Sequence, residues 1–374
     1  MGKQSGSLES VGQIMKTSLS DFYNGKKVFI TGHTSFKGTW LCEVLSMFGA
    51  NITGYSFGVP TDPSLFDICQ TEKKVHSYYG DIRDLDKLES VFDQANPEIV
   101  FHLAAQPIVR ESYRDPVRTY DINVMGTVNI LECTRKNESV KSFLNITTDK
   151  VYHNKEWDWG YRETDELDGY DPYSNSKSCS ELVTHGYKNS FFKDRDIAVS
   201  TARAGNVIGG GDFAKDRIIP DCVNAAVNNQ PIIVRNPYSI RPYQHVLEAV
   251  CVYLMLAMAQ YEDKSLQGYY NIGPDDNNCC RTGELVDMFI KHWGDGISWI
   301  NQYDGGPHEA SYLKLDCSKL KNTFDWKPVW NLDEAIKRVV DWSKCWITND
   351  DISQCMKNQI NDFMDQWKAG IPLR

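Results

Sequence analysis

Short apolar runs alternate with segments of helical spacing along the first half of the chain. The apolar runs predict strands at 27–31, 51–55, 75–79, 99–103, 142–148 and 197–204. Apolar residues that recur every three or four positions predict helices at 38–47, 85–94, 117–136 and 173–191. Apolar strands separated by helices are typical of a parallel sheet that is covered on both faces. The pattern predicts an α/β fold, a Rossmann-type doubly wound parallel sheet.

The rhythm changes after residue 204. Four glycines lie within Gly205 to Asp212, and prolines at 220, 231, 237 and 242 follow. A strongly apolar helix is expected at 245–260, with further helices at 285–293 and 332–346. We expect three parts: a flexible N-terminal tail at 1–22, a first domain of 23–205 plus about 240–272, and a smaller, discontinuous C-terminal lobe of about 206–239 plus 273–374.

Composition narrows the function classes. The 374 residues carry a formal net charge of −10, which argues against a nucleic-acid binder. The longest apolar run, Ala249 to Ala259, is too short to cross a membrane. Eleven scattered cysteines, with neither a C-x-x-C pair nor a Cys/His cluster, predict reduced thiols and no metal site. Because a secretory leader is also missing, we expect a cytoplasmic protein.

A glycine turn follows the first predicted strand and opens the first predicted helix. Its glycines would let the backbone approach a pyrophosphate placed at the helix N-terminus. The turn supplies six candidate cofactor contacts: Gly32, Thr34, Ser35, Phe36, Lys37 and Gly38. Such turns are common between a strand and a helix, so the turn alone is a weak signal.

The ends of the next strands strengthen the dinucleotide hypothesis. An acid after the third strand can meet an adenine amine, and small residues end the fourth strand where a cofactor would pass. These ends add the candidates Tyr55, Asp81, Ile82, Leu103, Ala104, Ala105 and Gln106. The second strand ends without the usual acid for a ribose and without an arginine for a 2′-phosphate, which mildly favours NAD.

A tyrosine and a lysine one helical turn apart form the clearest catalytic pattern. Asp171 can cap the helix, and Pro172 suits its first position. Tyr173 and Lys177 then share one helix face. A nearby ammonium favours the phenolate and lowers the pKa of the tyrosine, as a redox acid/base requires.

Polar residues also end the fifth predicted strand, at Thr148, Asp149 and Lys150. A plain oxidoreductase or an epimerase needs only a hydroxyl here. An acid beside a potential base indicates proton transfer beyond hydride transfer.

With these motifs, the chain resembles the extended short-chain dehydrogenases/reductases and, among them, the CDP-glucose 4,6-dehydratases. The resemblance spans residues 26–345. It is carried by the motifs at 31–38, 148–150, 154–157, 171–177, 203–212, 235–237, 241–246, 308–310 and 312–316. One departure is Ser35, where the family's phosphate turn usually has glycine.

The resemblance implies that CDP-glucose is converted to CDP-4-keto-6-deoxyglucose and water, with tightly bound NAD regenerated in each turnover. Tyr173 would take the C4 hydroxyl proton, Lys177 would hold the cofactor ribose, and Thr148 would hydrogen-bond the C4 oxygen. Asp149 would be the acid at the C6 hydroxyl and Lys150 the base at C5. Related dTDP-glucose dehydratases have Glu at this place, so Lys150 could instead only anchor a hydroxyl.

The first domain would therefore bind NAD and the C-terminal lobe the nucleotide sugar. We add Asn123 and Arg203 to the cofactor contacts. Arginines could clamp the diphosphate by forked hydrogen bonds. The substrate candidates are Gln106, Asn206, Arg217, Arg235, Arg241, His245, His308 and Tyr312.

Three alternatives stay open at this point. The first is a 4,6-dehydratase for a dTDP-, UDP- or GDP-linked sugar, because spacing does not reveal the base pocket. The others are a nucleotide-sugar epimerase and a non-catalytic cofactor-binding scaffold. We also expect a homodimer or homotetramer, because the helices at 117–136 and 173–191 resemble the family's subunit-packing pair.

Overall fold

A computed structural model describes residues 18–294, 296–303, 305 and 312–370. Seven strands form one parallel sheet: β1 (Lys27–Thr31), β2 (Asn51–Ser56), β3 (His76–Tyr79), β4 (Ile99–His102), β5 (Ser142–Ile146), β6 (Ala198–Ala204) and β11 (Tyr269–Ile272). Their order is β11-β6-β5-β4-β1-β2-β3. The strand order reverses between β1 and β4, and ligands of doubly wound sheets bind at such a switch point. The predicted fold class is confirmed.

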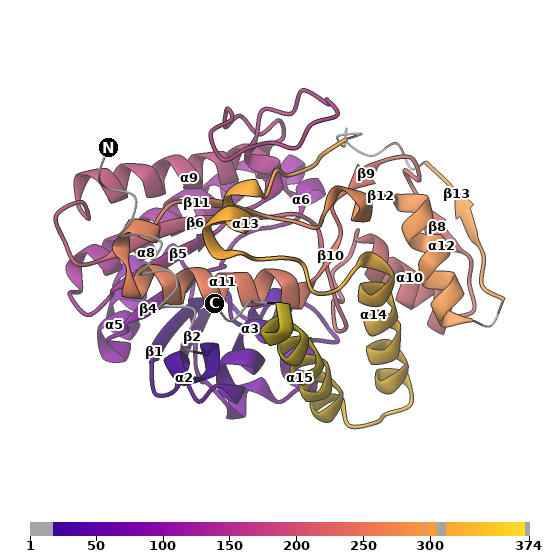
Figure 1. Ribbon diagram of the computed structural model, residues 1–374, viewed down its shortest axis with the longest axis horizontal. Helices are drawn as coiled ribbons and strands as arrows, with labels where there is room; N and C mark the ends of the chain where they lie inside the picture. Colours follow the sequence, from indigo (N-terminus) through magenta and orange to yellow (C-terminus); the bar gives the residue numbers. More distant parts are fainter. Residues whose placement is uncertain (1–17, 295, 304, 306–311, 371–374) are drawn as a thin grey trace.

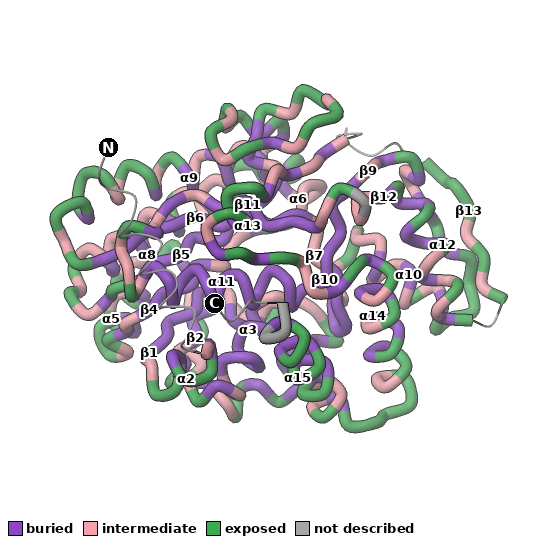
Figure 2. The backbone as a smooth tube through the Cα atoms, viewed as in Figure 1, coloured by how far each residue is buried: buried purple, intermediate pink, exposed green. Residues whose placement is uncertain are grey.

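Apart from the edge strand β3, the sheet is buried on both faces, as its apolar strands require (Figures 1 and 2). On β1, Val28 and Ile30 join the core beneath α3 (Phe36–Met47) and α11 (Val246–Glu262). Phe29 points the other way, into a second core. That second core lies beneath α5 (Leu85–Ala95), α8 (Gly126–Lys136) and α9 (Pro172–Ser190).

The helix expected at 117–136 is divided. It consists of α7 (Pro116–Tyr120), a π-helical turn η2 (Asp121–Met125) and α8. The wider turn carries Asn123, whose side chain is buried against the end of β4. π-turns are frequently found at functional sites, and this one faces the switch point.

The C-terminal lobe has its own core, which lies beside the sheet in Figure 1. Its elements are α10 (Ile218–Val227), β8 (Ile232–Val234), β9 (Ile240–Arg241), β12 (Cys280–Arg281), α12 (Thr282–Trp293), β13 (Trp299–Asn301) and α14 (Leu332–Ile347). α12 and α14 pack together through residues such as Leu285, Phe289 and Ile336. β8 pairs with β13, and β9 pairs with β12.

Both ends of the described chain pack on the first core. Residues 19–22, expected in the tail, belong to α2 (Leu19–Tyr23), because Leu19, Phe22 and Tyr23 bury one apolar face there. This corrects the expected start of the ordered chain; residues 1–17 lie outside the described residues. The helix α15 (Ile352–Gly370) also buries apolar residues in the first core, although the domain prediction assigned it to the lobe. The two-domain division itself stays a prediction.

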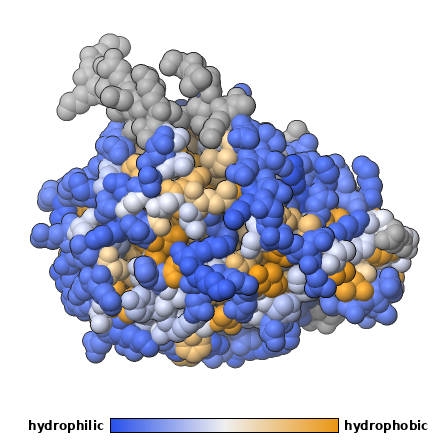
Figure 3. All heavy atoms as spheres, turned by 90° about the horizontal axis from the view of Figure 1, so that it is seen from below, coloured by the Kyte–Doolittle hydropathy of each residue, from blue (hydrophilic) through white to orange (hydrophobic). Residues whose placement is uncertain are grey.

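Short elements complete the fold. They are α4 (Leu65–Ile68), η1 (Thr71–Lys73), α6 (Val109–Arg114), η3 (Asp149–Val151), β7 (Val207–Ile208), β10 (Gln244–His245), η4 (Lys264–Leu266), η5 (Asp276–Asn278) and α13 (Ser318–Phe324). On the face shown in Figure 3, apolar patches are separated by hydrophilic residues. Within the described ranges, no helix is long and apolar enough to span a bilayer.

Candidate active site

The first turn of α9 places the predicted tyrosine and lysine. Asp171 caps the helix by accepting a hydrogen bond from the Ser174 amide at 3.0 Å, and Pro172 occupies the first turn. Tyr173 and Lys177 follow one turn apart, and both are buried. The Lys177 ammonium donates to the carbonyl of Ile146, at the end of β5, at 3.2 Å. The helix therefore delivers both side chains to the carboxyl edge of the sheet.

The turn after β5 faces the same tyrosine. Thr148 lies within hydrogen-bonding reach of the Tyr173 hydroxyl and donates to Asp149 Oδ1 at 3.0 Å. Asp149 is only 1% exposed, and its Oδ2 has no hydrogen-bond partner among the described residues. Burial raises the pKa of Asp149, while the nearby charge of Lys150 opposes this shift. The structure thus brings Thr148, Asp149 and Tyr173 together, with the half-buried Lys150 beside them.

Cations crowd this site. Lys37, from the glycine turn, donates to the Tyr253 hydroxyl of α11 at 3.2 Å. Burial, with the charges of Arg217 and Lys177, lowers the pKa of Lys37 to about 7. Burial lowers the pKa of Lys177 to about 8. Both amines can therefore lose a proton near neutral pH, and an anionic ligand would favour their charged forms.

Burial also dominates the predicted acid/base itself. It raises the pKa of Tyr173 to about 12, and the hydrogen bond from Thr148 opposes the rise. A tyrosine in this state holds its proton. A further positive charge beside the phenol would be needed to release that proton near neutral pH.

The glycine turn forms a tight cradle before α3. Gly32 has a φ of +78°, and a Cβ there would lie 2.8 Å from the Ala104 nitrogen. A Cβ on Gly38 would lie 2.2 Å from the Gly32 oxygen. Ser35 caps α3: its hydroxyl accepts from the Gly38 amide at 3.1 Å and donates to the Gly32 carbonyl at 2.7 Å. The hydroxyl proton of Ser35 is thus used inside the turn.

The neighbouring candidates hold this edge of the sheet together. Thr34 donates to the Gly58 carbonyl at 2.6 Å, and Tyr55 donates to the Asp81 carbonyl at 3.0 Å. A fork from Arg83 lowers the pKa of Asp81. Ile82 is buried, and Phe36 packs at the edge of the first core. Thr34, Tyr55 and Asp81 therefore already have protein partners.

The end of β4 lies against the cradle. The Ala104 amide donates to Thr31 Oγ1 at 3.1 Å, and Leu103 and Ala104 approach Gly32. Asn123 exchanges hydrogen bonds with the Gln106 backbone at 2.8 and 3.1 Å. The Gln106 amide donates to Thr119 and to the Ile108 carbonyl. Gln106 and Asn123 therefore shape the strand end, while Ala105 is partly exposed beside them.

Two predicted contacts are buried in the interior, where protein partners hold them. Arg203 is 1% exposed, and its guanidinium donates to Glu181, Tyr152 and the Glu163 carbonyl. A buried charge needs such partners, so the pairing with Glu181 gives Arg203 a structural role. His245 is fully buried and caps α11 by accepting from the Leu247 amide. We leave Arg203 and His245 out of the proposed contacts.

The remaining substrate candidates are spread along the second half of the chain. The charges of Arg217 and Arg241 act on the catalytic residues, since the first lowers the pKa of Tyr173 and the second that of Asp149, each against the rise caused by burial. Arg235 lies farther out, paired with Asp216 and Asp221. Asn206 is half-buried, and Tyr312 lies on the bridge to Ile240. His308 lies outside the described residues.

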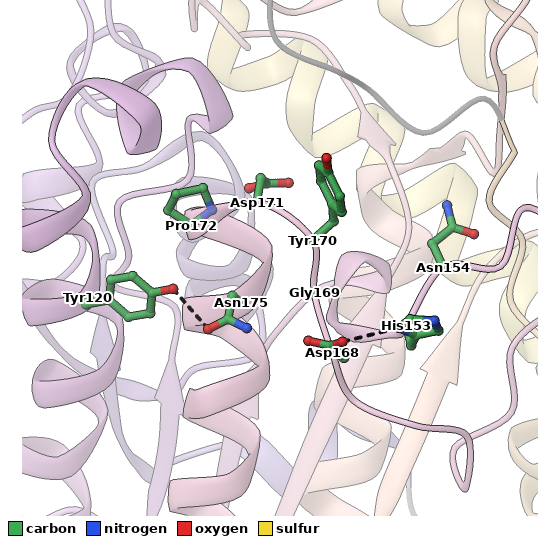
Figure 4. Close-up of a pocket in the computed structure, with 9 residues that line it drawn as sticks. All are labelled: Tyr120, His153, Asn154, Asp168, Gly169, Tyr170, Asp171, Pro172 and Asn175. Carbon is green, nitrogen blue, oxygen red and sulfur yellow. Dashed lines mark hydrogen bonds and ion pairs between the residues drawn. The ribbon is translucent and has the colours of Figure 1, made fainter.

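A surface pocket of about 400 Å³ opens beside the start of α9 (Figure 4). Tyr120 donates to Asn175 at 2.9 Å on one side, and His153 lies 3.2 Å from Asp168 on the other. The predicted catalytic residues do not line it. The pocket therefore lies outside the catalytic cluster, which consists of Thr148, Asp149, Lys150, Tyr173 and Lys177.

Tyr253 is the residue at this site that the sequence did not reveal. Its hydroxyl contacts Lys37, and the charge of Tyr173, far away in the sequence, acts on its pKa. It stands in the middle of the apolar run of α11, so its pattern indicated a core position. A hydroxyl inside an otherwise apolar helix is the one signal that could have identified it.

Comparison with known proteins identifies the family of this chain. The family model described as GDP-mannose 4,6 dehydratase matches residues 29–339. A CDP-glucose 4,6-dehydratase from Salmonella typhimurium is 48% identical over 92% of this chain and 98% of its own. A dTDP-D-glucose 4,6-dehydratase from Dictyostelium discoideum is 27% identical, over 85% of this chain and 82% of its own.

Among solved structures, a UDP-glucose 4-epimerase from Thermus thermophilus, in complex with NAD, superposes with a TM-score of 0.75 at 23% identity. The superposition covers 85% of this chain and 98% of the epimerase chain, and it supports the α/β fold described above. The family match extends over most of the chain, and the identity to the Salmonella protein is high. This chain belongs to the GDP-mannose 4,6 dehydratase family.

Proposed function

We propose that the protein is an NAD-dependent lyase that converts CDP-glucose to CDP-4-keto-6-deoxyglucose and water. The observation that carries this proposal is the buried Asp149, set beside Thr148, Tyr173 and Lys150. Oxidation at C4 uses the tyrosine, whereas elimination of water across C5 and C6 needs an acid and a base as well. The Salmonella relative supports CDP-glucose as the substrate.

The glycine cradle fits NAD. A Cβ at Gly32 or Gly38 would collide with the backbone of the strand end or of the turn, so these glycines allow the turn to close tightly at the start of α3. The N-terminus of a helix after such a turn favours a pyrophosphate. NAD, when bound, supplies the hydride acceptor for C4 and the hydride donor for C6. The chain contributes the cradle, the ribose contact of Lys177 and the surrounding proton transfers.

The oxidation half depends on Tyr173. Its hydroxyl takes the C4 hydroxyl proton, and Thr148 orients the same oxygen. Because burial raises the pKa of Tyr173 to about 12, the phenolate needs a further positive charge beside it, in addition to the cations of the chain. Ligand phosphates in turn favour the charged form of Lys177.

The elimination half depends on the turn after β5. Burial raises the pKa of Asp149, which favours the protonated carboxyl that donates to the C6 hydroxyl. Lys150 removes the C5 proton, which the C4 ketone makes acidic. Arg217, Arg235 and Arg241 hold the diphosphate, with Asn206 and Tyr312 beside the sugar nucleotide.

The test is one incubation of the purified protein with CDP-, dTDP-, UDP- and GDP-glucose, scored by NMR for a 4-keto-6-deoxy product. We expect the fastest turnover with CDP-glucose and a loss of about 100-fold or more in Tyr173→Phe. Faster turnover of another nucleotide sugar would mean that the protein prefers a nucleobase other than that of CDP. A C4 epimer as sole product would support an epimerase, and no product with NAD bound would support a scaffold.

We also propose a homodimer or homotetramer, as well as a cytoplasmic location. Exposed apolar side chains line α7, η2 and α9: Val117 is 79% exposed, Leu182 57% and Met125 48%. Such a face favours a second copy of the chain. The eleven cysteines are free thiols, which suits a reducing compartment.

A further inference from the structure

Two arginines from different parts of the fold meet one aspartate. Arg110 stands in the first turn of α6, beyond β4, and Arg235 follows β8 of the lobe. Asp216 Oδ1 lies 2.6 Å from Arg235 Nη1 and 3.8 Å from Arg110 Nε. This Arg110–Asp216–Arg235 bridge joins the edge of the sheet to the lobe.

The bridge is accessible to exchange. The side chain of Asp216 is 39% exposed and those of both arginines 25%. Asp216 also has a φ of +61°, in the left-handed region that costs a non-glycine residue on the order of 1 kcal/mol. A half-exposed ion pair contributes little, so a stronger anion can replace this carboxylate without unfolding the chain.

The bridge also lies one residue from the catalytic cluster. Arg217 follows Asp216 in the chain and acts on the pKa values of Tyr173 and Lys37. Arg217 is itself paired with Asp212 at 3.0 Å. The segment 212–217 thus holds Arg217 near the catalytic residues. Through Asp216, the same segment also contacts Arg110 and Arg235.

We propose that Asp216 is an internal substitute for a phosphate, which holds Arg110 and Arg235 until the diphosphate of the nucleotide sugar displaces it. Guanidinium groups bind carboxylates and phosphates with the same forked geometry, so one anion can replace the other. The inference rests on the proposed function for its substrate, and it adds Arg110 as a second arm of the diphosphate site. Displacement would release segment 212–217 toward the bound sugar.

A fixed positioning role for Asp216 predicts the opposite result. If Asp216 only orients Arg235, its loss weakens anion binding. If it competes with the substrate, its loss strengthens anion binding. The sign of the change therefore decides between the two roles.

The experiment titrates NAD-loaded protein with inorganic pyrophosphate and with CDP by calorimetry. Asp216→Asn keeps a residue that tolerates the left-handed backbone and removes the charge. We expect it to bind both probes about two- to fivefold more tightly, as the loss of one half-exposed ion pair implies. Arg110→Gln is expected to bind both more weakly, and the gain from Asp216→Asn should vanish in Arg235→Gln.

Asp362→Asn is the matched control, because Asp362 of α15 forms a 2.7 Å pair with Arg338 of α14 and is also about half exposed. Its affinities should equal those of the parent. Weaker or unchanged pyrophosphate binding in Asp216→Asn would overturn the inference, as would parental affinity in Arg110→Gln. Failure of CDP-glucose turnover with a tighter pyrophosphate complex would instead overturn the proposed function alone.

Discussion

At the residue scale, Lys150 has two competing chemical roles, a base at C5 and a hydroxyl anchor. It lies beside Asp149, whose pKa is raised by burial, and its charge opposes that rise. A base at this position would exchange the C5 proton of the sugar with solvent. A residue that only anchors a sugar hydroxyl would not. The proposal for elimination thus depends on this one amine.

We expect Lys150→Ala to stop incorporation of solvent deuterium at C5 of CDP-glucose, while oxidation at C4 persists. Turnover should fall by about 100-fold or more, the range for loss of a general base. NMR of the recovered sugar nucleotide measures the exchange. Lys193→Ala, at an exposed position outside these motifs, is the control and should behave as the parent. Unimpaired exchange in Lys150→Ala would leave Lys150 only as an anchor.

Ser35 shows how one departure from a family pattern is used. Its hydroxyl caps α3 and closes the turn through Gly32 and Gly38, rather than pointing to a ligand. We expect Ser35→Ala to lower the free energy of unfolding by about 1 kcal/mol, and Ser35→Gly by only a few tenths. Urea denaturation measures both. If Ser35→Gly lost as much binding free energy for NAD as free energy of unfolding, the hydroxyl would serve the cofactor instead.

At the scale of elements, α7, η2 and α9 pack against one another, and each carries an exposed apolar side chain. Leu182 stands on α9 and Val117 on α7, and neither is covered by the described chain. We expect Leu182→Arg to shift the protein toward a monomer in light scattering, because a buried unpaired charge opposes association. Val227→Arg, at a 41% exposed position on α10, is the control and should leave the mass unchanged. An unchanged mass in Leu182→Arg would move the interface elsewhere.

The elements also show what the sequence could and could not predict. The apolar strands β1 and β4 were predicted because both of their faces are buried and apolar. β11 was not predicted, because the polar Asn271, which is fully buried, interrupts its apolar run. Ile352, Met356, Ile360 and Phe363 have the spacing that could have identified α15. The π-turn has no sequence signal of its own.

The same limit applies to the candidate site. Tyr173 and Lys177 were predictable because one helix turn sets their spacing, and Asp149 because it ends a strand. The approach of Lys37 and Tyr253 depends instead on how α3 and α11 pack on one face of the sheet. Spacing along the chain contains no such information.

Across the whole molecule, three buried histidines link separate parts of the fold. His33 bridges Ser56 and Ser77 at 2.9 and 2.8 Å, and His102 lies 2.7 Å from Thr31. His245 packs against Trp40 and Trp330, which come from opposite ends of the chain. Burial lowers the pKa of His33 to about 4 and those of His102 and His245 to about 3.

These shifts predict acid sensitivity. The unfolded histidines have pKa values near 6.5, so below that pH the unfolded state binds more protons than the folded state. Their contribution to stability is complete above pH 6.5 and is lost as the pH falls toward the folded pKa values. Between pH 7.5 and 5.5 the loss is about 1.3 kcal/mol per histidine.

Glu248 acts in the opposite direction, because burial raises its pKa to about 8. Its folded form binds more protons between pH 4.5 and 8, so its contribution grows as the pH falls through that window. The total pH dependence therefore mixes both signs. The parent and a histidine variant share Glu248, so the difference between their pH dependences reports the contribution of the histidine alone.

Between pH 7.5 and 5.5, we expect the free energy of unfolding of His102→Gln to fall by about 1.3 kcal/mol less than that of the parent. The variant is less stable than the parent at both pH values. Urea denaturation at the two pH values measures this difference, and a constant loss from the broken hydrogen bonds cancels out. His76→Gln, at an exposed position on β3, is the control and should follow the parent. An identical pH dependence in His102→Gln and the parent would mean that His102 takes up its proton in the folded protein, through opening of the contact between β4 and α8.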